Sequence, residues 1–428
     1  MSDAPIPSAR ALLKERDYVV FWLSRFMGSV GSTVQSVIMA WVVYDLSRDQ
    51  GLDIGRSAFN VSLIGLITFA PLFFLALPAG EIADRHQRKR VLMLCYLGEA
   101  AVVAILAASE FMHFASVPLL LTSALFFGIS RSFFQPAGTA LGPMLVPREL
   151  LPRAIAWNSL AWQTASIGGP ALAGVLVSIS PGVGFAVTLA LYIGAAICLA
   201  MIRHPTQPVV QPGSRFELVK EGLAYVWSNK IVFGAISLDL AAVILGGATT
   251  LLPAFARDIL HVGEEGFGIL RAGPAIGATA VALWLAANPI RTKAGVFMFS
   301  GVAVFGIATV VFGLSGSIAQ AMNLPAATVG LAIAVVSLAL LGAGDMLSVY
   351  VRQTLVQLVT PDPMRGRVAA VSTLFISASN ELGEFESGIV ARFLGPVGAA
   401  VFGGVGALIV TGLWAKMFPA LRKADRLE

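Results

Sequence analysis

The sequence predicts an all-α membrane protein with twelve transmembrane helices in two pseudo-symmetric six-helix bundles. Three observations support this prediction: an apolar composition, twelve apolar runs of membrane-spanning length, and a repeat at half the chain length. Of the 428 residues, 57% are hydrophobic and only 12% are charged, whereas a soluble domain carries about 25% charged residues. Lipid is therefore the expected main solvent.

Twelve apolar runs, separated by Pro, Gly and charge clusters, are about 18 residues long or longer, which is enough to cross a bilayer. The first six cover residues 18–45, 57–82, 91–108, 117–146, 153–178 and 182–202. The second six cover residues 231–255, 267–287, 295–314, 326–358, 368–393 and 396–417. An even number of spans places both termini on the same side of the membrane.

The distribution of lysine and arginine indicates which side that is. One face holds 21 of the 29 cations, and the opposite face holds only Arg48, Arg56, Arg257 and Arg392. The positive-inside rule therefore predicts cytoplasmic termini in a multi-pass protein of the bacterial cytoplasmic (inner) membrane. Because the cations lie in short loops rather than on one basic face, no nucleic-acid partner is expected. Cys95 and Cys198 lie inside apolar runs without metal-ligand spacing and are expected to be free thiols.

An internal repeat supports the two-bundle organisation. Residues 145–159 return at 358–372 with one insertion, an offset of 213 to 214 residues, as expected for parallel six-span repeats. The expected domains are an N-terminal bundle (1–202), a cytoplasmic linker (203–230) and a C-terminal bundle (231–428). Within the linker, apolar residues at helical spacing over 216–227 predict an amphipathic helix on the inner membrane surface, the alternative being an ordinary linker.

A charged turn between the second and third spans carries the most informative motif. It consists of one glycine, one aspartate and three cations: Gly80, Asp84, Arg85, Arg88 and Lys89. This pattern resembles the G-x-x-x-D-[RK]-x-G-[RK]-[RK] signature of the major facilitator superfamily, except that Gln87 replaces a glycine. The resemblance extends over essentially the whole chain and implies the major facilitator fold. It also implies that these residues form a cytoplasmic gate, with Asp84 latched near the start of span eleven; the alternative is a topology anchor only.

Three further stretches, residues 143–147, 169–174 and 379–388, look like the branch that contains enterobactin exporters and macrolide efflux pumps, of the drug:proton antiporter type. The stretch 169–174 also approximates the family's antiporter motif in span five, although Ala165 and Ala173 replace glycines. The resemblance therefore implies an exporter.

Ionisable residues inside the spans mark the expected transport path, because each such charge costs about 2.5 to 3.5 kcal/mol or more unless it has a partner or water. In the resembled fold, spans one, four, seven and ten line the central cavity. In this chain those spans carry Arg25, Arg131, Asp239, Asp345 and Arg352. Together with the polar Gln35, Gln163 and Asn380, the cations and Asp239 are expected to form the substrate cavity. Glu99, in span three, would need a polar group on an adjacent helix.

Arg131 and Asp345 occupy equivalent positions in the two repeats, because 214 residues separate them. We expect them to face each other across the cavity as a charge pair that makes and breaks during alternating access. Two alternatives remain open: Arg131 holds an anionic substrate, or the pair is a static structural contact.

Span eleven contains the candidate proton-coupling groups. Glu381 and Glu384 are three residues apart and share one helical face with Asn380, whereas Glu386 points away. A carboxylate near the bilayer midplane favours its neutral form, which makes proton binding and release near neutral pH possible. Together with Asp345, these two glutamates are expected to couple proton entry to substrate exit. Metal coordination by the acidic cluster and a purely structural hydrogen-bonding role are the alternatives.

The sequence therefore predicts a secondary active transporter that exports a siderophore, drug or similar amphipathic small molecule by proton-coupled alternating access. The alternatives are a lipid or lysophospholipid flippase, a metal-ion exporter of the same fold, and a non-transporting membrane sensor. The sequence has no nucleotide-binding G-x-x-x-x-G-K-[ST] loop, zinc-binding H-E-x-x-H motif or G-x-S-x-G nucleophile elbow, so no enzymatic activity and no cofactor are expected. The expected partners are the small-molecule substrate, protons and membrane lipid, and the protein is expected to be a monomer.

Overall fold

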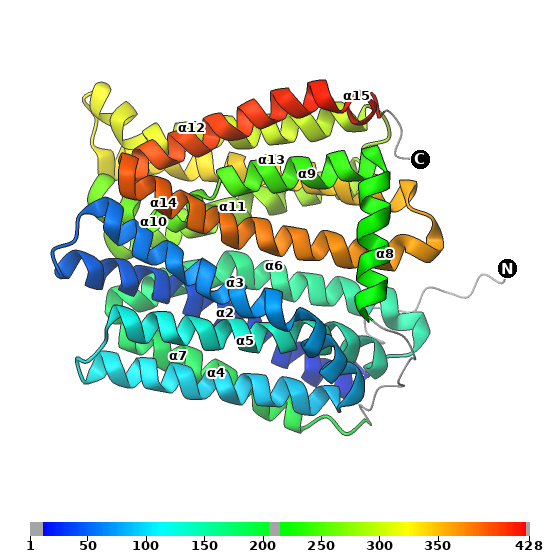
Figure 1. The fold of residues 1–428 in the computed structure, drawn as a ribbon. Coiled ribbons are helices and arrows are strands. Elements are labelled where there is room, and N and C mark those ends of the chain that lie inside the picture. Colours follow the sequence, from blue (N-terminus) through cyan, green and yellow to red (C-terminus); the bar gives the residue numbers. More distant parts are fainter. Residues whose placement is uncertain (1–11, 205–214, 425–428) are drawn as a thin grey trace. The chain divides into compact units, whose positions relative to one another are not determined.

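The structure, a computed structural model, describes residues 12–204 and 215–424. Every regular element in these two ranges is a helix (Figure 1). The first range contains α2 (Arg16–Asp49), α3 (Ile54–Arg85), α4 (Arg88–Phe111), α5 (Val117–Leu141), η1 (Gly142–Leu145), η2 (Arg148–Leu150), α6 (Leu151–Ile179) and α7 (Pro181–Ala200). The second contains α8 (Arg215–Ser228), α9 (Lys230–Leu245), η3 (Ala248–Leu251), α10 (Leu252–Ala254), η4 (Phe255–Ile259), α11 (Gly263–Ala287), α12 (Ala294–Ala321), η5 (Ala326–Gly330), α13 (Leu331–Val359), α14 (Asp362–Met417) and α15 (Pro419–Arg422).

The predicted twelve-helix membrane fold is confirmed. Among the described residues, 11 helices are long and apolar enough to cross a membrane. One of them, α14, is 56 residues long and is interrupted at Gly395, whose φ of 72° and ψ of 167° are not helical. Pro396 follows, and proline lacks the N–H that would continue a helix. Because α14 thus consists of two spans, the total is twelve.

Several helices extend about one turn beyond the predicted runs at one or both ends. For example, α2 ends at Asp49 rather than at residue 45, and α14 begins at Asp362 rather than at residue 368. Hydropathy detects only the apolar part of a helix, whereas backbone hydrogen bonding continues through the polar ends that reach beyond the hydrocarbon.

The seventh span is not the continuous helix over 231–255 that hydropathy predicts. Helix α9 ends at Leu245, and Gly246 and Gly247 separate it from the short elements η3 and α10 and the π-helix η4. A side chain at Gly247 would overlap the backbone of Gly383 on α14. The glycine pair therefore ends the helix and lets the chain approach α14 closely.

The described residues form two compact units. Unit 1 comprises residues 12–39 and 70–204, and unit 2 comprises residues 40–69 and 215–424. Helices α2 and α3 are each divided, because their joined halves (40–69) group with the C-terminal helices. The sequence-based division at 202 and 231 stays a prediction. In unit 2, α11 and α13 pack backbone to backbone, since a side chain at Gly277 would overlap Ala339 and one at Gly342 would overlap Pro274.

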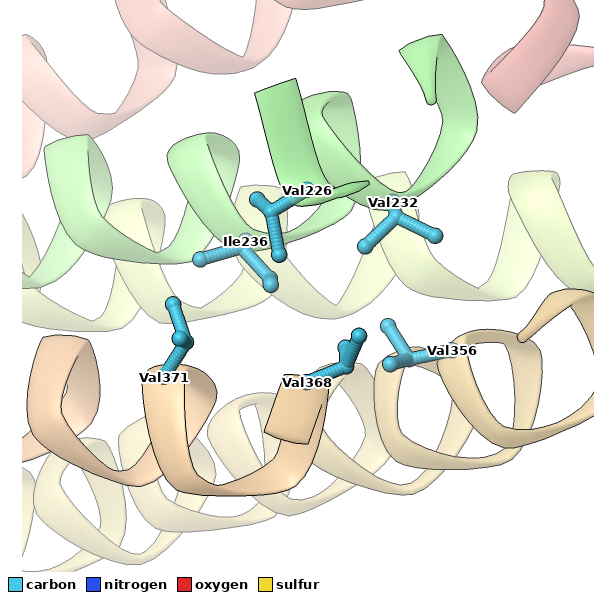
Figure 2. Close-up of a cluster of buried hydrophobic side chains, with 6 residues drawn as sticks. All are labelled: Val226, Val232, Ile236, Val356, Val368 and Val371. Carbon is cyan, nitrogen blue, oxygen red and sulfur yellow. The ribbon is translucent and has the colours of Figure 1, made fainter. Parts of the chain in front are cut away.

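The helix predicted over 216–227 is confirmed as α8. It crosses the ends of α9 and α14 (Figure 1), and its Val226 is buried in a cluster formed by α8, α9, α13 and α14. Figure 2 shows the members of this cluster: Val226, Val232, Ile236, Val356, Val368 and Val371. Leu223 and Trp227, in contrast, are exposed. One face of α8 thus packs on protein, and the location of the other face on a membrane surface stays a prediction.

Candidate functional site

The charged turn of unit 1 joins the ends of three helices. Arg88 begins α4, and its Nη1 donates a hydrogen bond of 2.9 Å to the carbonyl of Ala140 near the end of α5. Lys89 Nζ donates to the carbonyls of Ala200 and Ile202 at the end of α7, at 2.9 and 2.7 Å. Cations bound to the last carbonyls of a helix are favourable because those carbonyls carry the negative end of the helix dipole. Two of the three motif cations therefore hold the start of α4 against the ends of α5 and α7.

Two of the remaining motif residues form ion pairs with side chains close in sequence. Asp84 Oδ1 lies 4.0 Å from Arg88 Nη2, and the exposed Arg85 pairs with Glu81 at 2.6 Å. Gly80 is buried at the end of α3. The latch predicted between Asp84 and span eleven would connect unit 1 to unit 2, so it stays a prediction.

Glu99 has the partner on an adjacent helix that its position in hydrocarbon requires. It is 4% exposed, and its Oε2 accepts a hydrogen bond of 3.2 Å from Gln35 Nε2 on α2. Gln35 Oε1 in turn accepts from the hydroxyl of Tyr192 on α7, at 2.6 Å. Gln35 is fully buried in this chain of hydrogen bonds and joins α2, α4 and α7, and its predicted contribution to the substrate cavity stays a prediction.

The two arginines in the spans of unit 1 lie over aromatic rings. Arg25 is 4.7 Å from the ring centroid of Phe134, and Arg131 is 5.7 Å from that of Phe127. Such cation–π contacts stabilise a guanidinium in a low-dielectric setting. Arg25 Nη1 is also buried without a hydrogen-bond acceptor among the described residues. Gln163, on α6, is partly buried.

A buried ion pair lies inside unit 2. Arg352 Nη2 on α13 is 3.2 Å from Asp239 Oδ1 on α9, and the two side chains are 2% and 8% exposed. Asp345, two helical turns before Arg352 on α13, lines the same small cavity as Asp239, together with Phe305. Three of the predicted site residues thus come together. The predicted pairing of Asp345 with Arg131 concerns residues in different units and stays a prediction.

The carboxylates of Glu381 and Glu384, on α14, both lie next to Gly65 on α3. A Cβ placed on Gly65 would lie 3.4 Å from Glu381 Oε2 and 3.3 Å from Glu384 Oε2. The hydroxyl of Thr249, on η3, donates a 2.8 Å hydrogen bond to Glu384 Oε1. The absence of a side chain at Gly65 therefore makes room for two carboxylates, and the broken seventh span supplies a hydroxyl donor to one of them.

Two neighbours on span eleven lie outside this arrangement. Asn380 is exposed, and Glu386, two residues after Glu384, is partly buried. Among the residues described, no three His, Cys, Asp or Glu side chains are grouped so that they could hold a metal ion.

A second charged cluster, not predicted from the sequence, joins α2 to η4 within unit 2. Arg257 forms ion pairs with Asp45 and with Asp49, the latter at 3.1 Å. Asp258 accepts from Arg48 at 3.0 Å and from the hydroxyl of Tyr44 at 2.5 Å. The arrangement is reciprocal, because each helix contributes both an acid and a base. The repeat offset of 213 residues relates Asp45 to Asp258, and this signal could have revealed the cluster.

Replacing Arg257 with glutamine is expected to lower the free energy of unfolding by about 1 kcal/mol, because the pairs are only partly buried. The loss should shrink at high salt, which screens such charges. Thermal melting of the purified protein at low and high ionic strength measures both effects. Arg56→Gln is the matched control, since its pair with Asp53 is 61% and 62% exposed and should contribute nothing measurable. Equal melting of the two variants would contradict the prediction.

The helical architecture defines a multi-pass membrane protein with the major facilitator fold. Two solved structures share this fold. A bacterial homologue of the iron transporter ferroportin, in an inward-facing state, has a TM-score of 0.69 at 16% identity and covers 94% of this chain and 99% of its own. A peptide transporter has a TM-score of 0.70 at 13% identity, covering 96% and 95%.

The family assignment is more specific. A family model described as transmembrane secretion effector matches residues 7–428, so the chain belongs to that family. The multidrug efflux pump Tap of Mycobacterium tuberculosis is 26% identical over 414 residues, covering 93% of this chain and 92% of its own. The enterobactin exporter EntS of Citrobacter koseri is 27% identical over 379 residues, covering 86% and 85%.

Proposed function

We propose that this protein exports an amphipathic small molecule, of the drug or siderophore kind, from the bacterial cytoplasm by proton-coupled alternating access. Its similarity to a multidrug efflux pump and an enterobactin exporter over most of the chain supports the direction and the substrate class. The protein would lie in the inner membrane with both termini in the cytoplasm, as the distribution of cations favours.

The observation that carries proton coupling is the placement of Glu381 and Glu384 against Gly65. In this proposal, a proton bound at the site relieves the repulsion between the two carboxylates that lie next to Gly65. Thr249 donates to one carboxylate, and this bond links the protonation state of α14 to the broken seventh span. A change of charge here would therefore alter the contact between the segment of α3 near Gly65, α14 and η3.

The buried ion pair of Asp239 and Arg352, with Asp345 beside it, is proposed as a second coupling element. Proton uptake by either aspartate would weaken the attraction for Arg352 and allow α9 and α13 to shift. Arg25, Gln35, Arg131, Gln163 and Asn380 are proposed to contribute to the substrate cavity. In this proposal, Asp84 latches the cytoplasmic gate, while Arg88 and Lys89 hold the start of α4 against the ends of α5 and α7.

Glu381→Gln and Glu384→Gln test the coupling. Each variant is expected to reduce proton-driven efflux about tenfold or more, because an amide cannot bind and release a proton. The assay is efflux from an exporter-deficient bacterium, comparing catechol-type siderophores, macrolides and lysolipids with and without an uncoupler. Reconstituted vesicles with an imposed pH jump then report proton dependence directly.

Glu386→Gln is the matched control, because it removes a carboxylate two residues after Glu384 on the same helix, and Glu386 is not among the nearest contacts of Gly65. It should keep its response to the pH jump. Unchanged proton dependence in both site variants would remove these residues from coupling. Movement of lysolipids alone, insensitive to uncoupler, would favour a flippase.

A further inference from the structure

A polar pocket lies between the end of α13 and the beginning of α14 in unit 2. Its volume is about 230 Å³, which is below the roughly 300 Å³ at which pockets begin to hold drug-sized ligands. Among the described residues that line it are two arginines, two glutamines and three hydroxyl side chains, and none is Asp or Glu. The pocket is therefore suited in size and chemistry to a small group that accepts hydrogen bonds.

Arg352 provides the strongest reason to expect a ligand. It lines this pocket and is 1% exposed. Its Nη2 pairs with Asp239, but its Nε and Nη1 are buried without a hydrogen-bond partner among the described residues. These two nitrogens carry three N–H bonds. Buried donors without acceptors are costly, so a guanidinium in this condition calls for an acceptor that the protein itself does not supply.

The second arginine at the pocket, Arg365, is held in place by the protein. Its Nη1 pairs with Asp362 at 2.7 Å, and its Nε donates to the carbonyls of Gln357 and Thr360, at 3.0 and 3.3 Å. Gln353 and Ser372 add further donor groups to the lining, whereas the O–H of Thr373 is already donated to the carbonyl of Ala369. Arginine nitrogens combined with amide and hydroxyl donors are the usual recognition set for phosphate and carboxylate oxygens.

We propose that this pocket binds a phosphate group, which accepts hydrogen bonds from the unpartnered N–H groups of Arg352 and from the neighbouring amide and hydroxyl side chains. The site does not depend on whether the chain exports a drug or a siderophore. Two sources supply the same chemistry: free phosphate in the cytoplasm, and the headgroup of an anionic phospholipid. Because the pocket lies where one span ends and the next begins, it is at the level at which headgroups are found.

Thermal melting of the purified full-length protein in a neutral detergent tests the proposal, since a ligand that binds only the folded state raises Tm. One arm compares sodium phosphate with sodium chloride at equal ionic strength. The other compares phosphatidylglycerol with diacylglycerol, which lacks the phosphate. Either phosphate source is expected to raise the wild-type Tm by about 2 °C or more relative to its control.

Two variants assign the effect to the pocket. Arg352→Lys keeps a cation for Asp239 but loses the planar set of donors, and Ser372→Ala removes a lining hydroxyl. Thr354→Val is the control, because it removes a hydroxyl from α13, the helix of Arg352, at a position outside the pocket lining. Both pocket variants should lose at least half of the ligand-induced rise, while Thr354→Val retains it.

A response to soluble phosphate supports a free anion as the ligand, and a response to phosphatidylglycerol alone supports a lipid headgroup. The proposal is overturned if neither source raises the wild-type Tm. It is also overturned if Arg352→Lys and Ser372→Ala respond as fully as Thr354→Val does. Because melting does not involve transport, failure here would leave the proposed export function untouched.

Discussion

Replacing Arg352 with glutamine is expected to lower the free energy of unfolding by about 3 to 5 kcal/mol, the usual cost of removing one partner from a buried ion pair. Asp239 is 8% exposed in its side chain and lies 3.2 Å from the guanidinium. Without Arg352, it would keep its charge in a low-dielectric interior or take up a proton. Either outcome costs free energy that the pair avoids.

Denaturation of the purified variant measures this loss of free energy. Gel filtration after heating follows the loss of folded protein. The double variant Asp239→Asn with Arg352→Gln is the informative control, since two neutral amides leave no charge uncompensated. It should recover most of the lost stability, because replacing both partners is far less costly than replacing one. If the single variant melts at the wild-type temperature, the buried pair does not hold α9 against α13. The same conclusion follows if the double variant is less stable than the single variant.

The pairing of Asp239 with Arg352 also shows how much of the candidate site could be predicted from the sequence. Both residues are recognisable as charges inside spans, and the cost of burying them requires partners. Which partner each one finds depends on the rotation and depth of two helices that are more than a hundred residues apart in sequence. Symmetry between the repeats predicts a pair between Asp345 and Arg131, which stays a prediction. Within unit 2, the structure places Asp345 beside Asp239, which the sequence did not indicate.

The cluster of Arg257 and Asp258 was missed for a different reason. Counting cations loop by loop predicts topology, but it treats Arg48 and Arg257 as isolated charges and ignores the acids beside them. Their ion pairs with Asp258 and with Asp45 and Asp49 depend on the break in the seventh span, which brings η4 against α2. Hydropathy averages over that break, although the Gly246–Gly247 pair is visible in the sequence.

Replacing Gly383 with alanine is expected to destabilise the protein by about 1 to 3 kcal/mol, the cost of overpacking a close contact. A Cβ at this position would overlap the carbonyl oxygen of Val243 and lie 3.1 Å from Ile244 Cα. Backbone atoms cannot move aside as a flexible side chain can, so α14 must shift away from α9. Such a shift would lengthen the bond between Thr249 and Glu384, and proton-driven efflux should therefore fall more than the amount of folded protein does.

Gly412→Ala is the matched control, because Gly412 lies on the same helix and an added Cβ there meets nothing within 4 Å. Since alanine favours helix by up to about 1 kcal/mol over glycine, this control should melt at or above the wild-type temperature. The measurements are Tm in detergent and efflux per folded molecule in vesicles. Equal behaviour of the two variants would mean that the approach of α9 to α14 does not position Glu384, and the carboxylates at Gly65 would then have to act without help from the seventh span.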